Sequence, residues 1–224
     1  MIEKESGLGR IPYEMIVWDW DGTLMDSTPT IVDCIQKSCL DLSLPVPPNE
    51  LASHVIGLGL QDALRIAVPA LTPSQYPQMV ARFRYYYLAK DHELTLFKGI
   101  RELLAQLKQR GHYLAVATGK PRAGLNRSLK FHDLEDMFVD TRTADETRSK
   151  PHPQMLHELS ESLMVPLAKM LMIGDTSHDL LMASNAGVDA VAVTYGAHPA
   201  QSLRVLKPVA CVDTVDQLAT FLLK

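Results

Sequence analysis

Short runs of apolar residues, each three or four residues long, recur along the chain, and most of them end at a glycine, aspartate or threonine. Continuous apolar runs of this length are typical of strands buried on both faces, as in a parallel sheet covered by helices. Phe138–Val139 and Val209–Val212 are weaker examples of the same pattern. We therefore predict buried strands at four main places, which are Met15–Trp18, Leu114–Ala117, Met170–Ile173 and Val191–Val193.

Helical patterns separate these runs. From Gly99 to Arg110, apolar residues recur at i, i+3, i+4 and i+7 counted from Ile100, and Gly111 follows as a stop signal. Further helices are predicted over His152–Leu163, Asp179–Ala186 and Val215–Leu223. Strands that alternate with helices predict an α/β fold with a doubly wound, Rossmann-like parallel sheet, in which ligands bind at the carboxyl ends of the strands.

The stretch from Ser27 to Leu96 breaks this alternation, because it contains no convincing buried strand. Thr28-Pro29 is typical of a helix start, and the apolar spacing around Phe83 predicts a second long helix after a proline-rich break. We expect a small, all-helical cap domain over residues 27–96, inserted into an α/β core of residues 1–26 and 97–224. An insertion after the first strand lies over the strand ends, where it can act as a lid.

Composition narrows the classes of protein. The 224 residues are 46% hydrophobic and 21% charged, which is enough to bury a sizeable core. The formal net charge of -4 argues against a general nucleic-acid binder. No apolar run approaches the roughly 20 residues of a membrane helix. Met1–Arg10 has no apolar signal segment. Cys34, Cys39 and Cys211 lack the spacing of a zinc site and favour a reducing compartment. We expect a cytoplasmic protein without nucleic-acid or membrane partners, and no motif indicates an oligomeric state.

Two carboxylates, Asp19 and Asp21, lie just past the first predicted strand. Gly22 permits a tight turn after them, and the backbone N–H groups that follow can form a nest for an anion. Taken alone, this pair also fits a hydrogen-bonded turn with two solvated aspartates.

Three further segments bring polar groups to strand ends. The second main strand ends in Thr118-Gly119, where a hydroxyl and a glycine before a helix suit a phosphate group. Lys150 precedes a proline, which favours an extended backbone that projects the side chain, although a lone lysine also fits a solvated surface charge. Asp175 ends a later strand and Asp179 follows four residues on, although Asp175 alone also fits a helix cap.

Together these segments place carboxylates, a hydroxyl and an ammonium group at the ends of three parallel strands. Carboxylates held close together repel one another and raise each other's pKa. A hard divalent cation relieves that repulsion, and Mg²⁺ prefers a few carboxylates together with waters and a substrate phosphate. The pattern therefore predicts a site for Mg²⁺ and a phosphate group.

The same segments resemble, in order, the motifs of the haloacid dehalogenase superfamily, over nearly the whole chain from about Met15. The helical insertion resembles the small cap of the phosphoglycolate phosphatase-like branch, and Gly57-Leu58-Gly59-Leu60 is a weaker match to the cap loop of that branch. Four motifs carry the resemblance, and they are Asp19 to Leu24, Thr118-Gly119, Lys150, and Gly174-Asp175 through Asp179.

The resemblance implies the reacting groups and the metal ligands. Asp19 is implied to be the nucleophile that forms an aspartyl-phosphate. Asp21 is implied to protonate the leaving oxygen and then to deprotonate the attacking water. Mg²⁺ is implied to bind Asp19, the backbone carbonyl of Asp21, and Asp175, while Asp179 supports the metal site. A carboxylate that attacks phosphorus divides hydrolysis into two easier displacements.

The resemblance also implies how the phosphoryl group is held. Thr118 and Lys150 are implied to bind it, with backbone N–H groups near Gly22 and Gly119. The transition state spreads negative charge over the equatorial oxygens, so the metal, the ammonium and these N–H groups stabilise it electrostatically.

These roles imply a Mg²⁺-dependent phosphatase for a small phosphorylated metabolite, with 2-phosphoglycolate as the first candidate by analogy. The alternative is a phosphomutase resembling β-phosphoglucomutase, which returns an isomer, whereas a phosphatase releases inorganic phosphate. A dehalogenase is disfavoured because Asp21 is present. A receiver domain lacks an insertion of this size, and a non-catalytic scaffold would be expected to have lost a motif residue. Five cap residues are candidates for substrate choice, although each also fits a solvated side chain: His54, Arg65, Arg82, Arg84 and Lys90.

Overall fold

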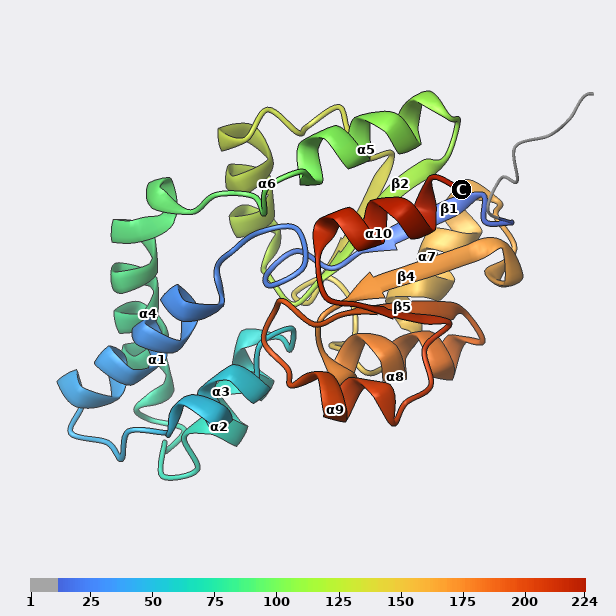
Figure 1. The fold of residues 1–224 in the computed structure, drawn as a ribbon. Helices are drawn as coiled ribbons and strands as arrows, with labels where there is room; N and C mark the ends of the chain where they lie inside the picture. The colour runs from blue at the N-terminus through green and yellow to red at the C-terminus, as the bar shows by residue number, and fades with distance from the viewer. Residues whose placement is uncertain (1–11) are drawn as a thin grey trace, which may run out of the picture.

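A six-stranded parallel sheet forms the centre of the computed structural model, which describes residues 12–224 (Figure 1). The strands are β1 (Met15–Trp18), β2 (Tyr113–Thr118), β3 (Asp140–Thr143), β4 (Met170–Gly174), β5 (Asp189–Val193) and β6 (Ala210–Val212). Their order is β3-β2-β1-β4-β5-β6, and every neighbouring pair is parallel. The sheet therefore grows outward in both directions from β1 and β4, and the α/β fold with a Rossmann-like sheet is confirmed.

Helices cover both faces of this sheet. One face carries α5 (Ile100–Gln109), α6 (Arg122–Phe131) and α10 (Val215–Leu222), and the other carries α7 (Gln154–Leu163), α8 (Ser177–Ala186) and α9 (Ala200–Arg204) (Figure 1). Short 3-10 turns occupy Asp91–Glu93 and Leu167–Lys169. Because side chains alternate along a strand, Ile16 and Trp18 of β1 pack into one hydrophobic cluster, whereas Met15 and Val17 pack into the other. Burial on both faces explains why the main strands are continuous apolar runs.

The edge strand β3 differs from the prediction. We expected a strand at Phe138–Val139, but the strand begins at Asp140. As an edge strand it pairs only with β2, so it is half-exposed over its first three residues and shows no apolar run. Phe138 instead packs edge-on against Trp20, with a ring-centroid distance of 6.2 Å.

The chain between β1 and α5 is helical. It consists of α1 (Thr28–Asp41), α2 (Asn49–His54), α3 (Leu60–Ala67) and α4 (Tyr76–Lys90), and in Figure 1 these helices stand together beside the sheet. The predicted start of α1 and the predicted long helix around Phe83 are both present. These helices bury a hydrophobic cluster of their own, which includes Ile35, Leu64 and Met79. The two short helices between them were not predicted.

Two chain segments connect these helices to the sheet, and they run side by side. Met25 and Leu96 form an antiparallel bridge, and the backbone N–H of Phe97 donates to the carbonyl of Leu24 at 3.0 Å. The chain therefore leaves and re-enters the sheet region at one place, beside the carboxyl end of β1.

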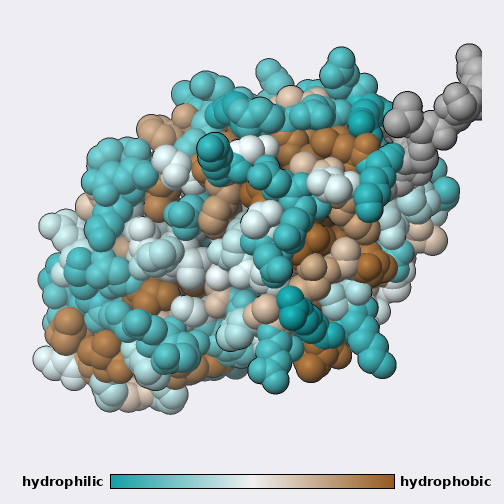
Figure 2. Space-filling model, in the orientation of Figure 1, coloured by the Kyte–Doolittle hydropathy of each residue, from teal (hydrophilic) through white to brown (hydrophobic). Residues whose placement is uncertain are grey.

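The surface of the molecule is mainly polar. Figure 2 shows hydrophilic residues over most of one face, with hydrophobic residues gathered in smaller areas between them. Within residues 12–224, no helix has both the length and the apolar character needed to cross a membrane. The three cysteines are free thiols, and Cys34 and Cys39 are buried as expected of small hydrophobic residues.

Candidate active site

Three buried carboxylates meet at the carboxyl ends of the two central strands. Asp19 follows β1, Asp175 follows β4, and Asp179 lies in the first turn of α8. All three are fully buried, and one carboxylate oxygen from each lies within 4.8 Å of the others. The strand order brings them together, because β1 and β4 are hydrogen-bonded neighbours although far apart in sequence.

Lys150 is the cation of this acidic cluster. Its Nζ lies 2.6 Å from Asp19 Oδ1 and 2.6 Å from Asp179 Oδ1, and its side chain is fully buried. Burial opposes the charged ammonium, but the two carboxylates outweigh that effect and raise the pKa of Lys150 above its ordinary value. Lys150 is therefore a buried, charged member of the site and not a solvated surface lysine.

One ammonium does not balance three carboxylates. Burial raises the pKa of Asp19 well above its usual range, and repulsion from Asp179 and Asp175 adds to this against the opposing effect of Lys150. Burial and then repulsion from Asp179 raise the pKa of Asp175 to about 7. The second oxygen of Asp19, Oδ2, is buried and has no hydrogen-bond partner among residues 12–224. Excess buried negative charge and an unpartnered carboxylate oxygen are what a divalent cation would satisfy, so the residues present fit such an ion.

The turn after β1 holds Asp175 in place. Gly22 has a φ of +85°, and a Cβ at this position would lie only 2.2 Å from Asp175 Oδ2. The hydroxyl of Thr23 donates to Asp175 Oδ1 at 2.7 Å, and the backbone N–H of Ala197 donates to Asp175 Oδ2 at 2.7 Å. Gly22 therefore serves both the turn and the close approach of a metal-ligand candidate.

The start of α8 fixes Asp179. Thr176 is the N-cap residue, and its hydroxyl accepts from the backbone N–H of Asp179 at 3.3 Å. In return, Asp179 Oδ2 accepts from the backbone N–H of Thr176 at 3.1 Å and from its hydroxyl at 2.7 Å. This capping box directs the other oxygen of Asp179 toward Lys150. The helix cap is thus Thr176, and Asp175 is not the capping residue.

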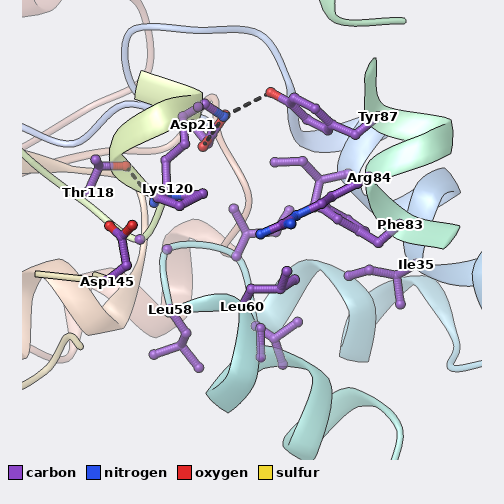
Figure 3. Close-up of a pocket in the computed structure, with 18 of the residues that line it drawn as sticks. Asp21, Ile35, Leu58, Leu60, Phe83, Arg84, Tyr87, Thr118, Lys120 and Asp145 are labelled. Carbon is purple, nitrogen blue, oxygen red and sulfur yellow. Dashed lines mark hydrogen bonds and ion pairs between the residues drawn. The ribbon is translucent and has the colours of Figure 1, made fainter. Parts of the chain in front are cut away.

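A second lysine–aspartate pair lies beside the acidic cluster. Lys120 Nζ lies 3.0 Å from both carboxylate oxygens of Asp21, and it donates to the hydroxyl of Tyr87 at 2.8 Å (Figure 3). The Ser27 hydroxyl donates to Asp21 Oδ1 at 2.8 Å. Tyr87 belongs to α4, so this group joins the inserted helices to the sheet, and burial raises the pKa of Tyr87 to about 12.

The loop Gly57-Leu58-Gly59-Leu60 lies against the end of β2. A Cβ at Gly119 would lie 2.4 Å from the backbone oxygen of Leu58, so only glycine allows this approach. The backbone N–H of Gly59 donates to the Ser149 hydroxyl at 2.8 Å. The hydroxyl of Thr118 accepts from the backbone N–H of Lys120 at 3.1 Å. The loop and the strand end together close one side of the site.

A cluster of histidines forms another contact between the inserted helices and the sheet region. His178 Nε2 and His198 Nε2 donate to the backbone carbonyl of His54 at 2.7 and 3.0 Å. The His54 ring stacks on His198 with a centroid distance of 4.8 Å. His54 is therefore a packing residue between two parts of the chain.

A cavity of about 380 Å³ lies between the inserted helices and the strand ends. Its floor includes Asp19, Asp21, Thr118, Gly119 and Lys120. Figure 3 shows side chains from α1, α3 and α4 facing this floor across the cavity. Asp19 and Asp21 are therefore reached through a partly open space of the size that small-molecule sites have.

The sequence profile of the haloacid dehalogenase-like hydrolases matches residues 16–193. The chain belongs to this family. It is 35% identical over 210 residues to Probable phosphatase IndB of Dickeya dadantii, covering 91% of each chain. It is 31% identical over 215 residues to phosphoglycolate phosphatase of Vibrio vulnificus, covering 92% of this chain and 94% of the relative.

A solved structure of a relative has the same fold. The crystal structure of a predicted phosphoglycolate phosphatase from Haemophilus somnus aligns with a TM-score of 0.84 and 26% identity, covering 95% of this chain and 99% of the other. This haloacid dehalogenase-like hydrolase is therefore a phosphoric monoester hydrolase of the phosphoglycolate phosphatase-like group.

In this haloacid dehalogenase-like hydrolase, the residues expected from the sequence lie at one place. The acidic cluster unites four of them, and Gly22 touches it. The carboxylate of Asp21 points away from the cluster to Lys120, so only its backbone is available for the metal role expected of it. Thr118 and Gly119 line the adjoining cavity.

Among the cap candidates, Arg84 lines the cavity and the others, His54 included, do not. Arg65, Arg82 and Lys90 form ion pairs on the outer surface of the helices, with aspartates as partners. No role was predicted for Lys120, although it directly follows Thr118-Gly119, and that position was the available signal. Tyr87 was also missed, since nothing in its own helix indicates a partner at the end of β2.

Proposed function

We propose that the protein is a Mg²⁺-dependent phosphatase that hydrolyses a small phosphorylated metabolite through an aspartyl-phosphate on Asp19. The observation that carries this proposal is the unpartnered oxygen of Asp19, which is buried among two further carboxylates and Lys150. Asp19 also lines the floor of the cavity. Asp19, Asp175 and the backbone carbonyl of Asp21 would hold the cation, with Asp179 in support. When bound, Mg²⁺ supplies a positive charge that stabilises the phosphoryl oxygens.

In the first step, a carboxylate oxygen of Asp19 attacks phosphorus and the ester P–O bond breaks. Asp21 in its acid form gives its proton to the leaving alcohol oxygen. Lys150 and Thr118, with backbone N–H groups near Gly22 and Gly119, bind the phosphoryl oxygens as charge develops on them.

In the second step, a water molecule attacks phosphorus, the bond to Asp19 breaks and inorganic phosphate forms. The Asp21 carboxylate accepts a proton from this water. Lys120 and Ser27 hold that carboxylate at the edge of the cavity.

The proposal also covers the domain boundaries of the chain and the location of the protein in the cell. We assign residues 27–96 to a cap domain and residues 1–26 and 97–224 to the catalytic core, of which 1–11 lie outside the described part of the chain. The paired connections at Met25 and Leu96 support this boundary. We place the protein in the cytoplasm, acting on a small metabolite without a nucleic-acid or membrane partner.

The test is release of inorganic phosphate from a panel of phosphomonoesters that includes 2-phosphoglycolate, sugar phosphates and nucleotides. The parent protein should release phosphate with Mg²⁺, lose activity in excess chelator and regain it when Mg²⁺ is restored. Asp19→Asn should abolish release, whereas Asp26→Asn, at an exposed aspartate of the same segment, should leave it intact. Full activity in Asp19→Asn, or in excess chelator, would contradict the mechanism. An isomeric sugar phosphate formed without free phosphate would indicate the phosphomutase alternative.

A further inference from the structure

The cavity has two unlike halves. The half formed by the strand ends is polar and contains Asp19, Asp21, Thr118 and Lys120. The half formed by the inserted helices is mainly apolar, with side chains from α1, α3, α4 and the loop before α3 (Figure 3). Six of these side chains form a surface that we call the apolar wall: Ile31, Ile35, Val55, Leu58, Leu60 and Phe83.

The charged groups around the apolar wall are mostly committed to other partners. Lys120 is bound to Asp21 and Tyr87. Arg127 forms an ion pair with Asp91. Arg84 makes no ion pair within residues 12–224, and its side chain extends into the cavity (Figure 3). The residue is exposed overall, so water screens its attraction for an anion. The six side chains of the apolar wall carry no charge and no polar group, so the wall itself offers little to a small, charged leaving group.

We propose that this wall selects the alcohol part of the substrate, and that the preferred substrate is a phosphate monoester of an alcohol with a ring-sized apolar body. This inference rests on the phosphatase activity proposed above. With the phosphate beside Asp19, such a body lies against the apolar wall, and its removal from water favours binding. A glycolate unit would leave most of the 380 Å³ to water and would leave the apolar wall uncovered.

The test compares monophosphates of primary alcohols, whose leaving oxygens are chemically similar but whose bodies differ. Phosphate release is measured from ethyl phosphate, 2-phenylethyl phosphate and 2-phosphoglycolate with Mg²⁺. We expect kcat/KM for 2-phenylethyl phosphate to exceed that of the other two by about tenfold or more, as burial of a larger apolar group requires. Equal values, or a higher value for 2-phosphoglycolate, would overturn the inference while leaving the phosphatase activity established.

A matched pair of variants on α3 locates the effect. Leu60→Asn places an amide of similar size in the apolar wall, so the ratio of kcat/KM for 2-phenylethyl to ethyl phosphate should fall toward one. Ile66→Asn alters the same helix at an exposed residue outside the cavity and should keep the parental ratio. A parental ratio in Leu60→Asn, with the fold intact by circular dichroism, would contradict the assignment of the wall.

A measurement of substrate binding tests the apolar wall independently of the proposed phosphatase activity. Titration calorimetry of Asp19→Asn with Mg²⁺ and each of the two alkyl phosphates measures affinity without turnover. We expect the 2-phenylethyl ester to bind about tenfold more tightly, with a negative heat-capacity change from apolar burial. Tight, selective binding without phosphate release from any ester by the parent protein would overturn the proposed activity and not the wall. Indistinguishable affinities would overturn the wall.

Discussion

Two buried lysine–aspartate groups each contribute an aspartate to the floor of the cavity, and they differ in where their partners come from. Lys150 binds Asp19 and Asp179, and all three belong to the segments around the sheet. Lys120 binds Asp21 but also Tyr87, which lies on the inserted helix α4. The partners of the first group therefore all come from the sheet region, whereas the second group also includes a residue of the inserted helices.

This difference separates the residues proposed to attack phosphorus and bind the metal from the residue proposed to transfer protons. The proposed nucleophile Asp19 and the proposed metal ligand Asp175 follow the hydrogen-bonded strands β1 and β4. The proposed phosphoryl-binding residue Thr118 ends β2, which pairs with β1. Asp21, the proposed acid and base, is held by Lys120, which also donates to Tyr87 of the inserted helix α4. A shift of α4 would change the surroundings of Asp21 and leave Asp19 untouched.

Removal of the first lysine should have the largest effect. Lys150→Ala leaves Asp19 and Asp179 without their buried cation and removes a phosphoryl-binding group, so kcat should fall by about 10²–10³-fold for every substrate. Steady-state phosphate release measures this, and Lys130→Ala, at an exposed lysine, is the control. Parental turnover in a folded Lys150→Ala protein would remove Lys150 from the mechanism.

The pH dependence of metal binding should come from the group that contains Lys150, where Asp175 lies. Because burial raises the pKa of Asp175 to about 7, the metal-free folded protein binds a proton there more tightly than the unfolded chain does. The stability from that proton is complete below the ordinary carboxyl pKa and is lost as pH rises through about 7. Mg²⁺ competes with the proton, so the metal should raise Tm by on the order of 5 °C near about pH 8, and by less near about pH 5.

Two isosteric variants separate the groups in this Tm measurement. Asp175→Asn should abolish the shift caused by Mg²⁺. Asp21→Asn keeps the backbone carbonyl and should retain the shift while losing turnover. A shift of equal size at both pH values, or its persistence in Asp175→Asn, would place the metal elsewhere.

The smallest effect on kcat is expected when the contact between Lys120 and α4 is removed. Tyr87→Phe removes only the hydroxyl that accepts from Lys120, so kcat should fall by about two- to tenfold without change in the Tm shift from Mg²⁺. Tyr85→Phe, on the exposed side of α4, serves as the control. If both tyrosine variants keep the parental kcat, the position of Asp21 does not depend on α4.

Strands buried on both faces were predictable because burial demands unbroken apolar residues, as in Met15–Trp18 and Met170–Gly174. The edge strand β3 was misplaced, since Asp140–Thr143 is half-exposed and carries no such signal. The short helices α2 and α3 are stabilised by a shared hydrophobic cluster, and six or eight residues carry too little periodic pattern to be recognised.

The site residues that were predictable from the sequence are those that lie at or directly after the predicted strands. Asp19, Thr118 and Asp175 directly end strands or follow them, so a sheet topology is sufficient to bring them together. The link from Lys120 to Tyr87 spans 33 residues and joins the segment after β2 to α4. Such a contact depends on how α4 packs, and apolar spacing along the chain does not contain that information.

Met25 and Leu96 pair at the single place where the chain leaves the core and returns to it. A segment with adjoining ends behaves as a module, because exchanging it breaks no strand pairing in the sheet. A chimera that receives the corresponding segment of a relative at these two junctions is thus expected to inherit the donor's selectivity while retaining the host's chemistry. Recombination at this junction can therefore change the substrate range of a protein while its catalytic residues stay the same.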